Sequence, residues 1–457
     1  MPTAAPASAD TQPLAGSLTP LPGLPPMGHR RHADPQARYR VVRGETVART
    51  RGLTPEDQTL QSMPDASPTK WHLAHTTWFF ETFLLTPSVP GYRPFDPTFR
   101  YLFNSYYDGV GDRWPRAARG LLSRPTVAQV MAYRDHVDQA MDTWLSGDID
   151  ARAAALLELG LQHEQQHQEL IITDIKHALL THPFPPPVFP PPTPVVAPRT
   201  DDIVWRAMPS GLYAVGSDGG AGEGTDFIFD NEGPRHKVWL EAFEIADRVV
   251  TNADYLAFIE EDGYRRADLW LSDGWATVQA QGWQAPLYWR RGEEGAWHVG
   301  TLSGVRPVDP NDPVCHVSLY EADAYARWAA ARWPGARLPT EAEWEIAAGE
   351  PSAGPGAGPD MGSGAAHADD DSFHPRAVAG FYGDVWEWTA SPYTGYPGYR
   401  PPEGAIGEYN GKFMSGQMVL RGGSRATPAG HIRKTYRNFF PPAARWQFSG
   451  IRLARTP

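Results

Sequence analysis

Two histidines at helical spacing are the first residues of this sequence that could do chemistry together. His163 and His167 lie in the run LQHEQQHQEL, residues 161–170, whose composition favours a helix. Residues four apart on a helix share one face, with Cβ atoms about 5–6 Å apart, so two imidazoles at this spacing can hold one metal ion. A polar helix face with two solvated histidines would show the same spacing, and the motif alone does not decide between these interpretations.

The surrounding sequence predicts the elements that must position these histidines. Residues 152–180 and 126–141 have apolar residues at helical spacing. A third helix is expected over 71–85, where Ser67 can cap the helix and Pro68 suits its first turn. Several helices in this half of the chain predict a bundle, and the core of a bundle is a usual place for a metal site.

Composition excludes several classes of function. The chain has 457 residues and a net charge of −12, which argues against a nucleic-acid partner. Its one cysteine, Cys315, cannot form a disulfide within the chain, which favours the cytosol. No apolar run approaches the roughly 20 residues that span a bilayer, so we expect no membrane partner.

Changes in composition divide the chain into four segments. Residues 1–37 are rich in Ala, Pro, Ser and Thr and lack the basic start and apolar stretch of a signal peptide, so we expect a disordered leader. The helical domain is expected over 38–182. Residues 183–200, which contain PFPPPVFPPPTP, are expected to be a stiff linker, and 201–457 a second domain. This division favours a ligand groove between the two domains.

The composition of the second domain differs from that of the first. It has short strand-like runs, many glycines and scattered tryptophans, and it shows no fixed-period repeat. Its expected strands are 212–216, 235–240 and 243–246, its expected helices are 251–261 and 319–333, and 349–371 is a low-complexity loop.

Four motifs in this second domain carry a resemblance to a known family. They are PVCHVS at 313–318, ARLPTEAEWE at 336–345, GDVWEWT at 383–389 and RGGS at 421–424. They resemble the formylglycine-generating-enzyme/sulfatase-modifying domain, a mixed α+β fold related to C-type lectins. The first half resembles a DinB-type helical bundle. The implied fold class is therefore multidomain, α and then α+β.

The two halves joined, with WHLAH at 71–75 and HEQQH at 163–167, are similar to the ergothioneine-forming sulfoxide synthases. That resemblance implies an Fe(II)- and O2-dependent enzyme. Such an enzyme joins a thiol sulfur to the imidazole C2 of hercynine, which is trimethylhistidine, and oxidises that sulfur to a sulfoxide. Its small-molecule partners are then hercynine, the thiol and O2.

The resemblance also implies the metal ligands. The family pattern matches His75, His163 and His167, and His72, one turn before His75, is expected not to be a ligand. Three neutral imidazoles suit Fe(II), Zn or Cu, so the preference for iron comes from the resemblance and not from the donor set.

Substrate-binding residues follow from the same match. Gln166, Tyr409 and Asn438 stand where the family contacts hercynine, and Phe439 is expected to pack on the ligand. A quaternary ammonium such as that of hercynine is usually held by aromatic faces and nearby carboxylates. Each of these residues could instead be an ordinary hydrogen-bonding or packing residue.

The proton donor distinguishes two branches of the family. One branch uses a tyrosine three residues before the position of Tyr409, where this chain has Ile406. Another uses paired tyrosines after an Asn-Ser dipeptide, and this chain has Tyr106 and Tyr107 there. A phenol near the metal could donate a proton to reduced oxygen and steer sulfoxidation over thiol dioxygenation. Otherwise the pair would be loop aromatics that pack over the bundle.

Two further positions bear on the thiol. The branch that binds γ-glutamylcysteine uses an Asp and an Arg where this chain has Phe440 and Ala444. A charged glutamyl tail would lose both partners, and a buried unpaired carboxylate is costly, so free cysteine is the expected thiol. Arg113 and Arg116 are candidates to bind its carboxylate bidentately, although either could be a surface residue.

Other functions stay open on the sequence alone. Cys315 is expected to be a small buried side chain, and a single cysteine argues against the paired-cysteine chemistry of formylglycine-generating enzymes. A selenoneine-forming synthase that uses a selenosugar, the same reaction with γ-glutamylcysteine, and a zinc-dependent DinB-type thiol transferase are the alternatives. A ligand-binding module built on the lectin-like domain would leave the three histidines and the tyrosine pair unexplained.

Overall fold

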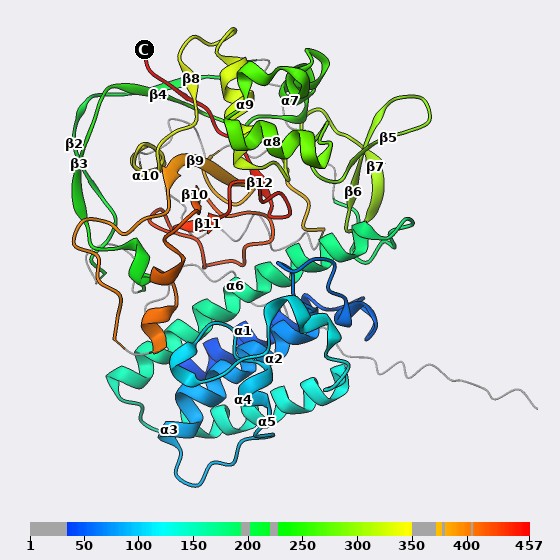
Figure 1. Ribbon diagram of the computed structural model, residues 1–457. Coiled ribbons are helices and arrows are strands. Elements are labelled where there is room, and N and C mark those ends of the chain that lie inside the picture. Colours follow the sequence, from blue (N-terminus) through cyan, green and yellow to red (C-terminus); the bar gives the residue numbers. More distant parts are fainter. Residues whose placement is uncertain (1–33, 193–201, 220–226, 350–371, 377–379, 404) are drawn as a thin grey trace, which may run out of the picture.

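A helical lower domain and a mixed upper domain make up the protein (Figure 1). The computed structural model describes residues 34–192, 202–219, 227–349, 372–376, 380–403 and 405–457. The predicted order, a helical bundle followed by an α+β domain, is confirmed. Most of the expected leader, the end of the expected linker and nearly all of the low-complexity loop lie outside the described residues.

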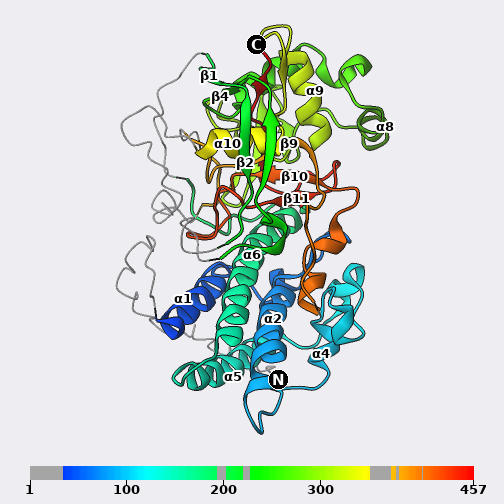
Figure 2. The same ribbon diagram turned by 90° about the vertical axis from the view of Figure 1, so that its left-hand side faces the viewer.

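Long helices lie side by side in the lower domain (Figure 2). They are α1 (Pro35–Ala48), α2 (Thr69–Phe80), α5 (Val127–Leu145) and α6 (Ala151–Thr181). The shorter segments are η1 (Asp57–Thr59), the π-helical η2 (Glu81–Leu85), α3 (Thr86–Ser88), α4 (Phe99–Leu102), η3 (Asp108–Val110) and η4 (Arg116–Leu121).

Local chemistry explains where these helices begin. Asp34 accepts a hydrogen bond from the amide of Gln36, and Pro35 suits the first turn, so α1 starts inside the segment that the sequence analysis assigned to a leader up to residue 37. Thr126 forms a capping box with Gln129 at the start of α5. Helix α2 begins directly after Pro68, and all of its residues are buried.

A glycine sets the separation of α2 and α6. A Cβ on Gly160 would lie 2.7 Å from Phe80 and 2.9 Å from Phe79, closer than real Cβ contacts allow. The missing side chain lets these two rings of α2 reach the backbone of α6. The two helices therefore pack closely at the level where each presents histidines.

Short, mostly antiparallel strands form the sheets of the upper domain. One sheet has the order β1-β4-β13-β8, a second has the order β11-β10-β9-β12, and two smaller sheets are β2-β3 and β5-β6-β7. Of these pairs, β12 and β9 run parallel. The strands are β1 (Trp205–Met208), β2 (Gly211–Val215), β3 (His236–Leu240), β4 (Phe243–Ala246), β5 (Trp289–Arg291), β6 (Trp297–Thr301), β7 (Gly304–Pro307), β8 (Ala336–Arg337), β9 (Trp386–Pro392), β10 (Met418–Arg421), β11 (Asn438–Phe440), β12 (Ser449–Gly450) and β13 (Ala454–Arg455).

Helices complete the upper domain. The three expected strands agree with β2, β3 and β4 to within one residue at each end, and the expected helix 319–333 ends at Ala329. The helical segments are α7 (Asn252–Glu260), α8 (Ser272–Gln281), α9 (Leu319–Ala329), α10 (Glu341–Gly349), η5 (Asp230–Glu232), η6 (Gly263–Arg265), η7 (Ala267–Leu269), η9 (Ala405–Glu408) and η10 (Gly411–Phe413).

Helix α6 joins the two domains. Its buried Glu169 accepts hydrogen bonds from the indole of Trp386 at 2.6 Å and from the hydroxyls of Ser424 and Thr427 at 2.8 Å each. The segment that contains η9 and η10, orange in Figure 1, descends from the upper domain onto the bundle. Both domains therefore contribute to the surface of α6 that holds the histidines.

The described part of the expected linker is not free of the domains. The amides of Val188 and Phe189 donate to the carbonyl of Leu302 at 2.9 and 3.2 Å, and both side chains pack on a hydrophobic cluster. This part of the segment therefore lies against the upper domain. Among the described residues, no helix has the length and apolarity that crossing a bilayer requires.

Candidate metal centre

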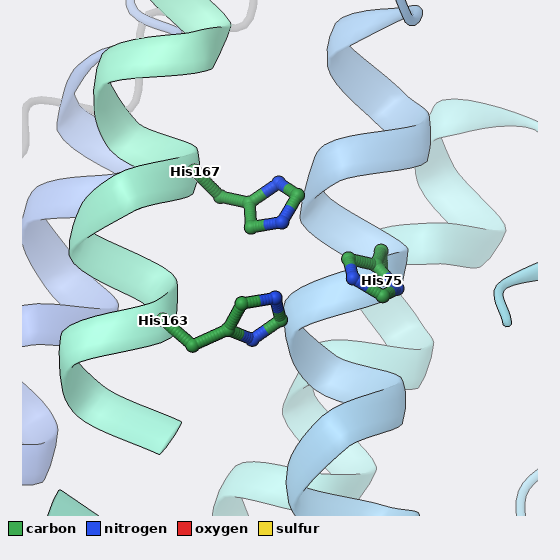
Figure 3. A group of neighbouring side chains, drawn as sticks. All are labelled: His75, His163 and His167. Atoms are coloured by element: carbon green, nitrogen blue, oxygen red, sulfur yellow. The ribbon is translucent and has the colours of Figure 1, made fainter. Parts of the chain in front are cut away.

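Three histidines from two helices meet in the interior of the bundle. His75 comes from α2, and His163 and His167 from α6 (Figure 3). One nitrogen of each ring lies within 4.8 Å of the others. The exposed fraction is 0% for His75, 1% for His163 and 7% for His167. The structure thus brings together the three histidines that the family resemblance implied as ligands.

The hydrogen bonds of these rings leave nitrogens available. His75 Nδ1 donates to the carbonyl of Phe103 at 2.6 Å, and His167 Nδ1 lies 2.8 Å from Nδ1 of His72. His75 Nε2 and both nitrogens of His163 are buried and have no hydrogen-bond partner in the described part of the chain. Buried polar atoms without partners cost free energy, and a metal ion would satisfy these nitrogens.

The protonation of the three rings suits metal binding. Burial lowers the pKa of His163 to about 3. Burial and the neighbouring histidines hold the pKa of His75 and of His167 well below the usual value. The imidazoles are therefore neutral at physiological pH, which is the form that binds a metal. Donor type, burial and protonation all fit a mononuclear site.

Aromatic rings enclose this site. The indole of Trp71 stacks on one face of His75, at 4.6 Å between centroids, and that of Trp78 lies 5.5 Å away, also near parallel. The ring of Phe79 lies 5.0 Å from His163. Such packing limits the rotation of the imidazoles and keeps bulk water from them.

The tyrosine pair lies next to this aromatic shell. The rings of Tyr106 and Tyr107 stack at 4.8 Å, and Tyr107 lies 5.6 Å from Trp78. Buried Asn104 shapes the loop, since its amide donates to the carbonyls of Tyr107 and Gly111 and its oxygen accepts from the Tyr107 amide. Burial raises the pKa of both phenols, so they keep their protons at neutral pH.

The upper domain adds Tyr409, which precedes η10. Its ring lies 5.6 Å from His163 and 6.0 Å from Tyr106, and it stacks on Phe229. Its hydroxyl contacts the side-chain oxygen of Gln166, whose amide nitrogen donates to the Tyr436 hydroxyl at 2.6 Å. Gln166 and Tyr409 therefore both lie at the histidine site, at the junction of the domains.

Asn438 and Phe439 lie further along the same surface, on β11. The side-chain oxygen of Asn438 accepts from the amide of Phe439 at 2.9 Å, and Phe439 stacks on Tyr393 at 4.0 Å. Phe413 connects this strand to the tyrosine loop, with its ring 5.9 Å from Phe439 and 5.3 Å from Tyr106. The contact of Phe439 with the site thus runs through one intervening ring.

The two arginines expected to bind the carboxylate of the thiol are exposed. Arg113 forms an ion pair with Asp108 at 2.8 Å, and Arg116 donates to the carbonyl of Asp65. In these positions each already has a partner at the surface. Both guanidinium groups are thus at the surface, and their role as ligands of the thiol's carboxylate stays a prediction.

A third arginine of the same segment, Arg119, is buried and was not among the predicted site residues. Arg119 is 3% exposed, its guanidinium lies 3.3 Å from the ring centroid of Trp71, and it donates to the hydroxyls of Ser67 and Ser105. Burial, together with nearby Arg116, holds its pKa well below the usual value. Arginines at 113, 116 and 119 have equal spacing, so the sequence offers no signal that only the last one turns inward.

Cys315 is buried, as expected, and burial raises the pKa of its thiol to about 12. It belongs to the hydrophobic cluster beneath the C-terminal part of α6 and not to the histidine site. A thiol of this kind is protonated and weakly nucleophilic at neutral pH.

Comparison with known proteins identifies both halves. The sulfatase-modifying factor enzyme 1-like domain matches residues 193–457, and the DinB superfamily matches residues 38–171. A hercynine oxygenase of Mycolicibacterium thermoresistibile is 34% identical over 86% of this chain and 88% of its own length. One of Mycobacterium tuberculosis is 32% identical over 86% of this chain and 91% of its own length. A formylglycine-generating enzyme of Streptomyces coelicolor is 36% identical over 34% of this chain and 50% of its own length.

We expect the three histidines to bind one divalent ion per chain. After anaerobic loading with Fe(II) and gel filtration, elemental analysis should find about one ion per wild-type chain. Replacement His163→Ala removes one of three ligands, so bound metal should fall below about a tenth of that value. His177→Ala, which removes a histidine that bonds to Ser62 instead, is the matched control and should bind normally. Full metal content in the His163 variant would contradict this site.

Proposed function

Because the chain belongs to the hercynine oxygenase family and is an oxidoreductase of the oxygenase type, we propose that it is an Fe(II)-dependent sulfoxide synthase that joins cysteine to hercynine. The product would be hercynyl-cysteine sulfoxide, a precursor of ergothioneine. The observation that supports the metal part of this proposal is the buried group of three neutral imidazoles with available nitrogens.

The proposed reaction balances without another reductant. The C2–H bond of hercynine and the S–H bond of cysteine break, and a C–S and an S–O bond form. The second oxygen atom leaves as water with the two hydrogens, so O2 accepts all four electrons. Fe(II) held by the three imidazoles would supply the binding and activation of the thiolate sulfur and of O2.

The residues that line the site have separate roles in this proposal. Gln166 and Tyr409 orient the imidazole of hercynine, because a side-chain amide next to a ligand and a phenol can both bond to its nitrogens. The aromatic ring of Tyr409 suits its trimethylammonium group, and Asn438 with Phe439 would complete this end of the site. Tyr106 or Tyr107 supplies a proton to the oxygen that leaves as water.

Arg119 is the proposed ligand of the cysteine carboxylate, in place of Arg113 and Arg116. Its Nε has no hydrogen-bond partner in the described part of the chain, and its two Nη atoms donate to the hydroxyls of Ser67 and Ser105. Burial makes a cation costly, and a carboxylate that binds there would offset that cost. Its contact with Ser105 places it beside the tyrosine loop.

Free cysteine is preferred over γ-glutamylcysteine because Phe440 and Ala444 carry no charge that could bind the glutamyl group. Ala444 is buried, and the ring of Phe440 packs 5.7 Å from that of Trp446. Fe(II)-loaded protein with hercynine and O2 should therefore form the sulfoxide adduct with cysteine and at least about tenfold less with γ-glutamylcysteine, by mass spectrometry. An adduct with γ-glutamylcysteine alone would keep the family and overturn the specificity. No adduct with either thiol would favour a selenosugar or the zinc transferase.

The tyrosine pair should control which oxidation product forms. Replacing both by phenylalanine, Tyr106→Phe with Tyr107→Phe, removes the proton donors, so sulfoxide formation should slow about 10²-fold or more. Cysteine sulfinic acid, the product of thiol dioxygenation, should rise as a share of the oxygen consumed. Tyr101→Phe, at an exposed tyrosine of the same region, is the control and should change neither quantity. An unchanged product ratio in the double variant would remove the proton-donor role.

The role of Arg119 can be separated from folding by the choice of thiol. Arg119→Met should raise the KM for cysteine about 10- to 100-fold, since a charge-assisted hydrogen bond is worth roughly 1.5–3 kcal/mol. Cysteamine lacks the carboxylate, so its KM should be nearly equal in the wild type and the variant. Arg113→Met should behave as the wild type does with both thiols. Equal losses for cysteine and cysteamine in Arg119→Met would mean that Arg119 only supports the structure.

A further inference from the structure

His72, which was expected not to bind the metal, contacts a ligand instead. It lies on α2 one turn before His75, and its Nδ1 is 2.8 Å from Nδ1 of His167 on α6. Its other nitrogen, Nε2, is 3.0 Å from a carboxylate oxygen of Asp174, also on α6. His72 and Asp174 are 2% and 4% exposed, so these contacts are shielded from water. His72 is not a member of the group of three histidines.

The direction of each hydrogen bond follows from the available donors and acceptors. The Asp174 oxygen that contacts His72 already accepts the amide hydrogen of Ser67, so the hydrogen of this contact is assigned to Nε2 of His72. In a neutral His72 ring, Nδ1 is then an acceptor, and Nδ1 of His167 must donate to it. This tautomer leaves the lone pair of His167 on Nε2. The opposite tautomer would place a hydrogen on that nitrogen and block its binding to a metal.

Asp174 is held in place independently of His72. The Asp174 oxygen that contacts His72 also accepts a hydrogen bond from the backbone amide of Ser67 at 2.8 Å. The second carboxylate oxygen of Asp174 lies 3.4 Å from the hydroxyl of Thr173. Asp174 is seven residues after His167, so both lie on the same face of α6. The chain of contacts thus runs from α6 to α2 and back to α6, and it depends on the packing of these two helices.

The three ligands differ in what supports them. His75 donates to a neutral backbone carbonyl, and His163 has no hydrogen-bond partner in the described part of the chain. Of the three, His167 alone is connected through its partner to a carboxylate. A partner of this kind orients a ligand and raises its basicity, and its loss usually lowers metal affinity about 10- to 100-fold.

We propose that His72 and Asp174 are positioning residues that set the tautomer and orientation of His167 and thereby strengthen its bond to the metal. This inference rests on the proposed function, because it requires that the three histidines bind an ion. It assigns to His72 and Asp174 a role that involves neither metal ligation nor contact with substrate.

The test measures the affinity for Co(II), whose visible absorption reports on the ligand geometry, in the full-length protein. We expect His72→Phe to weaken Co(II) binding about 10- to 100-fold and to alter the absorption bands, since His167 loses its acceptor. Asp174→Asn keeps an oxygen acceptor but removes the charge, so its loss should be smaller. His177→Phe is the control, because His177 bonds to Ser62 and not to a ligand. The melting temperature of each metal-free variant shows whether it is folded.

The outcomes separate this inference from the proposed function. Unchanged Co(II) affinity and spectrum in a folded His72→Phe variant would overturn the positioning role and leave the metal site intact. If the wild type binds no Co(II), or if His163→Ala binds as well as the wild type, the proposed function itself fails. If His72→Phe does not fold, Asp174→Asn decides the matter. Asp174→Asn must then show a weaker affinity for Co(II) and shifted absorption bands. Wild-type values for both quantities would refute the positioning role.

Discussion

The close packing of α2 against α6 is the constraint on which the site depends. Gly160 makes it possible, because any side chain there would collide with Phe79 and Phe80. At this separation His75 reaches the two histidines of α6, and the same packing removes all three rings from water. Burial then keeps the imidazoles neutral, so one interaction accounts for both the geometry and the protonation of the site.

Because the site is buried, the polar groups near it need hydrogen-bond partners within the protein. Glu164, next to His163, is fully buried and accepts hydrogen bonds from Arg43, Arg134 and Thr46. This network holds α1, α5 and α6 together around the histidines. Removing one member would leave a buried charge without its partner, which typically costs about 3–5 kcal/mol. The bundle is thus held together by packing and also by buried charge pairs.

The site also depends on both domains. Helix α6 supplies two histidines on one side and bonds through Glu169 to Trp386 on the other, while Tyr409 approaches His163 from the upper domain. The proposed substrate contacts and the proposed metal ligands therefore share one helix. A displacement of the upper domain along α6 would move Tyr409 relative to His163.

The sequence by itself determined the local features: the helices around 152–180, the placement of His163 and His167 on one face, and the fold class through its motifs. The helix and the shared face depend on spacing within one element, which helical geometry converts directly into position, whereas the fold class follows from a family resemblance. Tertiary structure alone decided which arginine of three is buried, that Arg119 meets Trp71, and that His72 joins His167 to Asp174. Such contacts bring together residues far apart in the chain. Their distances follow from how helices pack, and neither residue type nor spacing along the sequence contains that information.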